Sequence, residues 1–218
     1  MKPIYAARFA GVTGLAAGLY PFLEWQLFHL QLLVPPETTT PFSQLLPQLA
    51  LGGWLSLLAI FAWMTLLVTL MYSYSPIHRV TTTMQSGLTL MSAVLLILGV
   101  LLVMNRLELA VAYEGNSSSA APIGLTLASV EQIAIALLEA GLLMGGGVMA
   151  WISFDLVLLG KLPALWMAPG IFAGLALVPA PILGLSSWQL LIALAGFFLF
   201  CLVLGARRTL PESYPPLG

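Results

Sequence analysis

The residues that could do chemistry in this chain lie inside its most apolar stretches. Residues 123–159 are almost wholly apolar, yet they contain Glu131, Gln132 and Glu139. A carboxylate in the middle of a bilayer is costly against lipid, so these side chains are expected to face protein or water. Stepping by seven gives a polar and small stripe on one helical face, formed by Gln132, Glu139, Gly146 and Ser153. We therefore expect this stretch to form the central wall of a membrane-embedded bundle.

Two further apolar stretches carry a stripe of the same kind. Residues spaced by seven are Gln85, Ser92, Gly99 and Arg106 in one stretch, and Ala10, Ala17 and Glu24 in the other. We expect these stripes to face each other, with Arg106 paired to Glu24, to Glu131 or to both. The reason is energetic, because an unpaired buried arginine is far costlier than a paired one.

The carboxylates outnumber the arginine in this outer-half polar layer. Glu24, Glu108, Glu131 and Glu139 accompany Arg106 alone, so not all four are expected to be ionised while buried. Two interpretations stay open: an outward-opening site for a proton or small cation, or an ion pair with interfacial carboxylates that reach water. The candidate ligand- or proton-binding residues are Glu24, His29, Arg106, Glu131, Gln132 and Glu139.

The chain has two histidines and no recognisable metal or cofactor motif. His29, near Glu24, is either a metal or chlorin ligand or a hydrogen-bonded anchor at the membrane interface. His78 is expected on the opposite side of the membrane, which excludes a bis-histidine haem within one chain. We predict no metal and no cofactor.

The sequence contains no recognisable catalytic motif. Lys2 and Lys161 are both expected at the inner ends of spans, so no mid-membrane lysine is available for a retinal Schiff base. His-Glu-x-x-His, phosphate-loop and Gly-x-Ser-x-Gly motifs are absent, and no nucleophile with a neighbouring base is visible. A membrane-embedded enzyme therefore ranks below a non-catalytic protein.

The composition determines which elements position these residues. Of 218 residues, 60% are hydrophobic and 7% are charged, against about 25% charged in soluble domains. Several apolar runs exceed the about 18 residues that cross a bilayer as a helix, and they lack the alternation of a transmembrane barrel. The net charge of −1 and the scattered basic residues give no footprint for nucleic acid. We predict an all-α, polytopic transmembrane helix bundle.

We expect one transmembrane domain over residues 1–218, with six spans at about 5–33, 47–72, 80–112, 123–159, 165–182 and 188–205. In this topology one side of the membrane holds Lys2, Arg8, Arg79, Lys161, Arg207 and Arg208. The positive-inside rule then places both termini in the cytoplasm. At the same inner end, Asp155 is expected to form an interfacial ion pair with Lys161 or Arg79, with a proton exit as the alternative.

Two short motifs resemble those of a bacterial family. Ala7-Arg8-Phe9-Ala10-Gly11 and Leu159-Gly160-Lys161-Leu162-Pro163, followed by Gly170 and Gly174, resemble an uncharacterised group of bacterial six-helix membrane proteins, a domain of unknown function. That resemblance implies a similar order of helices, with a turn joining a long fourth helix to a final hairpin. The resemblance supports this architecture and implies no activity. We expect the protein to be integral to a bacterial inner (plasma) membrane.

These observations favour a non-catalytic membrane module, such as an accessory subunit or a sensor. The alternative is a small proton- or cation-coupled transporter that uses Glu24, Glu131 and Glu139. The expected partners are the lipid bilayer and, beyond it, other membrane subunits or a second copy of the chain. Small-xxx-small pairs serve either packing within one bundle or a dimer face, and they are Gly14–Gly18, Gly141–Gly145 and Gly170–Gly174.

Overall fold

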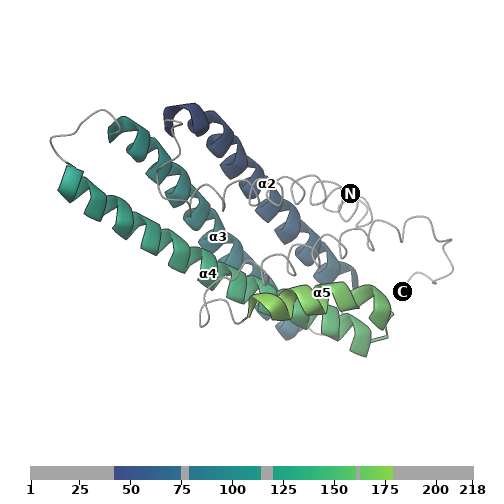
Figure 1. Ribbon diagram of the computed structural model, residues 1–218. Coiled ribbons are helices and arrows are strands. Elements are labelled where there is room, and N and C mark those ends of the chain that lie inside the picture. The colour runs from purple at the N-terminus through teal and green to yellow at the C-terminus, as the bar shows by residue number, and fades with distance from the viewer. Residues whose placement is uncertain (1–41, 75–78, 114–119, 161–162, 179–218) are drawn as a thin grey trace.

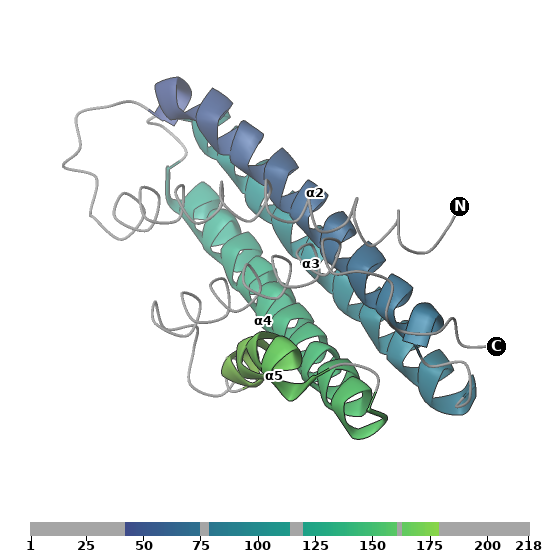
Figure 2. The same cartoon turned by 90° about the vertical axis from the view of Figure 1, so that its right-hand side faces the viewer.

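The computed structural model describes residues 42–74, 79–113, 120–160 and 163–178. This part of the chain is all-helical, as predicted, and comprises α2 (Phe42–Tyr74), α3 (Arg79–Tyr113), α4 (Ala120–Leu158) and α5 (Ala164–Leu177). The three long helices lie side by side, and the short α5 packs against the C-terminal half of α4 (Figure 1, Figure 2). The predicted spans 5–33 and 188–205 and both termini lie outside the described residues, so the six-span topology stays a prediction.

Each long helix contains a stretch that is long and apolar enough to cross a membrane. These stretches are Ala50–Val68, Val80–Asn105 and Ala128–Leu158. The one in α4 has 31 residues, which at 1.5 Å per residue is roughly 46 Å, more than the about 30 Å of a hydrocarbon core. We expect α4 to tilt or to extend beyond the core, as predicted for an over-long span.

The helix ends differ from the predicted spans by one to five residues, and the differences at the starts of α2 and α4 occur at prolines. α2 begins at Phe42 and continues through Pro47, where the sequence predicted a start. A proline inside a helix forfeits one backbone hydrogen bond, and membrane helices tolerate that loss. α4 includes Pro122 in its first turn, where a backbone N–H has no helical partner in any case.

The connection between α4 and α5 depends on one glycine. Gly160 has φ of +63°, a conformation that favours glycine, and its N–H donates to the carbonyl of Val157 at 3.0 Å. Pro163 then precedes the first residue of α5. The predicted turn therefore begins at Gly160 and ends before α5 at Pro163, with residues 161–162 outside the described part of the chain.

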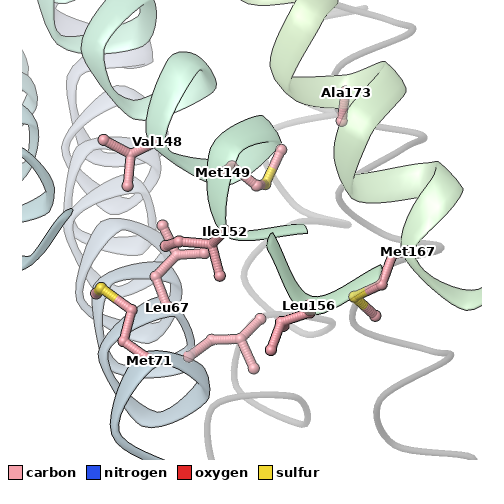
Figure 3. Close-up of a cluster of buried hydrophobic side chains, with 9 residues drawn as sticks. Leu67, Met71, Val148, Met149, Ile152, Leu156, Met167 and Ala173 are labelled. Carbon is pink, nitrogen blue, oxygen red and sulfur yellow. The ribbon is translucent and has the colours of Figure 1, made fainter. Parts of the chain in front are cut away.

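A hydrophobic core joins α2, α4 and α5 at the end of the bundle where α2 and α4 terminate (Figure 3). The side chains come from all three helices, so burying them fixes the position of α5 against the long helices. Its members are Leu66, Leu67, Met71, Val148, Met149, Ile152, Leu156, Met167 and Ala173.

The outward faces of the long helices are apolar as well. On α2, large exposed side chains recur every three or four residues, and Trp54 is 63% exposed. On α3 and α4 the same pattern includes Met84, Met91 and Phe154. Continuous apolar surface of this kind is unfavourable in water and suits a lipid environment.

Candidate functional site

The buried face of α3 is polar over three turns. Its members recur every three or four residues, which places them on one side of the helix, and they are Thr82, Gln85, Thr89 and Ser92. Gln85, Ser92 and Gly99, predicted to share a face, are all buried. Sequence reasoning missed Thr82 and Thr89, because it stepped only by sevens. Alternating steps of three and four would have found them.

Two hydroxyl groups on this face donate hydrogen bonds to backbone carbonyls. Thr89 Oγ1 donates to the carbonyl of Gln85 at 2.8 Å within α3. Ser92 Oγ donates to the carbonyl of Gly141 at 2.6 Å, which joins α3 to α4. A buried hydroxyl without a partner is costly, so these bonds allow the polar face to be buried.

A second polar contact links α3 to α4 nearer the α4–α5 turn. Gln85 Nε2 donates to Asp155 Oδ2 at 2.8 Å, and Gln85 is only 2% exposed. Asp155 is half-buried. The sequence had suggested Lys161 or Arg79 as its partner, but the side chains of both lie outside the described residues, so that ion pair stays a prediction.

Glycines bring α3 and α4 into close contact. A β-carbon at these positions would lie on a neighbouring side chain: at Gly99 it would be 2.7 Å from Leu138, at Gly141 2.7 Å from Leu96, and at Gly145 2.5 Å from Trp63 and 2.6 Å from Ser92. We call Gly99, Gly141 and Gly145 the glycine seam. The Gly141–Gly145 pair therefore serves packing within the bundle.

The contact between α4 and α5 is closer still, because backbone meets backbone. A β-carbon on Gly146 would lie 2.7 Å from the carbonyl oxygen of Gly174 and 2.7 Å from Leu177 Cβ. Ser153 lies two turns further along the same face of α4 and is fully buried. Its Oγ has no hydrogen-bond partner among the described residues.

These contacts define the antiparallel register of α3 and α4. Ser92 meets Gly145, Leu96 meets Gly141 and Gly99 meets Leu138. For each residue toward the C-terminal end of α3, the facing residue lies one position nearer the N-terminal end of α4. Continuing for seven residues beyond Gly99 brings the backbone of Arg106 level with that of Glu131.

The structure places the predicted site residues only in part. Glu131 and Glu139 are half-buried on α4, whereas Gln132 is exposed. Arg106 lies in α3, but its side chain is not among those described, and Glu24 and His29 lie outside the described residues. The predicted meeting of these six side chains therefore stays a prediction.

The described helices hold no cluster of the acidic, histidine and cysteine side chains that bind most metal ions. Over α2 to α5, no group of three or more His, Cys, Asp or Glu side chains could hold a metal ion. The expectation of no metal and no cofactor stays a prediction for the whole chain.

The described part of the chain is all-helical, and three of its helices are long and apolar enough to cross a membrane. Comparison with known proteins gives no match: no family model matches the sequence, and no curated protein or solved structure does so. The resemblance to bacterial six-helix membrane proteins therefore rests on the short motifs alone.

Proposed function

We propose that this protein is a non-catalytic helical module of a bacterial inner membrane, acting as an accessory subunit or a sensor within a larger assembly. The observation that carries the proposal is the glycine seam together with the contact of Gly146 and Gly174. At these glycines α4 is in close contact with α3 on one side and with α5 on the other. Close packing of this kind favours a rigid interior in the described bundle.

The continuity of α4 supports the same proposal. Many ion-coupled carriers bind their substrates where a membrane helix is broken and its backbone groups are freed. The Gly145-Gly146-Gly147 run is the point in α4 where a break would be expected, yet α4 is one helix from Ala120 to Leu158. Gly145 and Gly146 serve helix packing there, and the helix does not unwind.

The proposed topology has six spans, with both termini in the cytoplasm. The polar layer at the far end of α3 and α4 would then fix the order of the helices through Arg106. Extending the register of α3 and α4 by seven residues beyond Gly99 supports Glu131 as its partner. An arginine that pairs across two helices specifies their register, because slipping either helix would leave a buried charge unpaired.

The outward apolar faces of α2, α3 and α4 are the surfaces that lipid or other membrane subunits would contact. Their large side chains remain exposed within the described bundle, and Trp54 and Phe61 on α2 are examples. Membrane helices associate through such faces by close packing, with no need for polar residues. A second copy of the chain is one partner that fits this surface.

One observation favours the alternative, a small proton- or cation-coupled transporter. Glu131 and Glu139 lie half-buried within the apolar stretch Ala128–Leu158. Carboxylates at such positions are typical of ion pathways, because burial without a functional reason is costly.

Reconstitution separates the two functions. Full-length protein in proteoliposomes is given a proton or sodium gradient, and the decay of the gradient is followed with a fluorescent dye. A module should leave the decay rate equal to that of empty liposomes. Faster decay that disappears in the Glu139→Gln variant would establish the transporter and overturn the module.

A further inference from the structure

The end of α4 carries a carboxylate in an unfavourable place. Asp155 begins the last turn of α4, which ends at Leu158, and that turn has no basic residue. The C-terminal end of a helix bears partial negative charge, so a cation is stabilising there and an anion is not. Asp155 also lies inside the apolar stretch Ala128–Leu158, where a charged group requires compensation.

The described partner of Asp155 does not supply that compensation. Gln85 donates one amide N–H to Asp155 Oδ2 at 2.8 Å. The amide is neutral, so it orients the carboxylate without cancelling its charge. Gln85 is itself almost fully buried, and the hydrogen bond from Thr89 to its backbone carbonyl fixes the turn of α3 from which it extends.

Oxygen atoms of the kind that bind alkali cations gather at this level. The register that pairs Ser92 with Gly145 brings Thr82 level with Asp155 ten residues further on. Thr82 is buried and lies one turn before Gln85 on the same face of α3, so its hydroxyl belongs to the level of α3 from which the Gln85 amide reaches the Asp155 carboxylate. Hard cations take carboxylate, amide and hydroxyl oxygens, and in membrane proteins helix C-terminal ends help to coordinate Na⁺.

We propose that Asp155, Gln85 and Thr82 form a binding site for an alkali-metal cation, Na⁺ or K⁺, at the C-terminal end of α4. The site lies at the opposite end of α3 from Arg106 and goes beyond the module function proposed above. Arg79 and Lys161 are the basic residues near this end in the sequence. An ion pair between Asp155 and either of them would take the place of the cation.

The sequence makes this proposal directly measurable, because Asp155 is the only aspartate in the chain. Full-length protein labelled with ¹³Cγ-aspartate and held in lipid nanodiscs should give a single carboxyl resonance in the NMR spectrum. NaCl or KCl then replaces choline chloride at constant ionic strength and pH. A saturable shift of the resonance with Na⁺ or K⁺ is expected, with choline as the reference that produces none.

Two variants locate the site. Gln85→Met keeps the length of the side chain but removes the amide, and it should raise the half-saturating cation concentration about tenfold or more, since a hydrogen bond to a charged group is lost. Glu108→Gln is the matched control: it removes an exposed carboxylate near the other end of α3 and should leave the titration unchanged.

The proposal fails if neither Na⁺ nor K⁺ moves the resonance of the wild-type protein, a result that needs no variant to fold. In that case, a shift of the resonance in Lys161→Gln or Arg79→Gln would show that an ion pair within the chain neutralises Asp155 instead.

Discussion

Gly146 is the position at which one added methyl group should separate two helices. In Gly146→Ala the new β-carbon would lie 2.7 Å from the carbonyl oxygen of Gly174 and 2.7 Å from Leu177 Cβ. Neither atom is at the end of a flexible side chain, so neither can rotate away. The helices must move apart, and the core formed by Met167 and Ala173 with α4 must loosen with them.

The neighbouring Gly147 provides a control, because its substitution by alanine should change the free energy of unfolding in the opposite direction. A β-carbon on Gly147 would meet no atom within 4 Å. Overpacking costs about 1–3 kcal/mol, and alanine gains about 0.5–1 kcal/mol over glycine in a helix. Gly146→Ala should therefore lower the free energy of unfolding by roughly 0.5–2 kcal/mol. Gly147→Ala should raise it by roughly 0.5–1 kcal/mol.

The assay is unfolding of the purified protein in mixed micelles with increasing SDS, followed by helical circular dichroism, with wild type and both variants measured together. The order Gly147→Ala, wild type, Gly146→Ala, from most to least stable, is expected. If Gly146→Ala were as stable as Gly147→Ala, the backbone contact between α4 and α5 would be refuted.

Two serines give further predictions in the same assay. Ser92→Ala removes the hydrogen bond to the Gly141 carbonyl and should cost about 1 kcal/mol; no loss would show that this bond does not hold α3 to α4. Ser153→Ala removes a buried hydroxyl that lacks a partner within the described helices, so stability should stay equal or rise by about 1 kcal/mol. A marked loss in Ser153→Ala would mean that the hydroxyl has a partner.

Much of the described fold can be predicted from the composition of the chain and from the positions of its prolines and glycines. Low charge and long apolar runs are enough to predict membrane-length helices, because few other structures bury so many backbone groups among apolar side chains. The bounds of α3 differ from the prediction by one residue at each end. The sequence predicted that α2 begins at Pro47, because proline is common in the first turn of a helix. The helix begins earlier, at Phe42, and continues through the proline.

The stripe on α4 shows where pattern reasoning reaches its limit. The sequence placed Gln132, Glu139, Gly146 and Ser153 on one face. In the structure Gln132 is exposed, whereas Gly146 meets α5 and Ser153 is fully buried. A straight α-helix turns about 20° per seven residues away from such a stripe, so its two ends face different neighbours. Which neighbour packs where depends on tertiary contacts that the spacing does not encode.

The partners of the polar residues on α3 also depend on tertiary contacts that the spacing does not encode. Gln85 and Ser92 were recognised as members of a buried stripe, but their partners on α4 were not. Charge alone predicts a basic partner for Asp155, and that ion pair stays a prediction because the side chains of Lys161 and Arg79 lie outside the described residues. The amide of Gln85 became its partner through the register of α3 and α4, and that register is set by glycine contacts such as the one between Gly141 and Leu96.

A double-mutant cycle between Arg106 and Glu131 tests the proposed arrangement of the membrane helices most directly. Arg106→Gln, Glu131→Gln and the double variant are compared by their free energies of unfolding, with Glu108→Gln in place of Glu131→Gln as the control cycle. If the two residues pair, Arg106→Gln should lose about 3 kcal/mol, and the double variant should lose at least about 1 kcal/mol less than the sum of the single losses. Losses that add to within about 0.5 kcal/mol would contradict the pairing of Arg106 with Glu131.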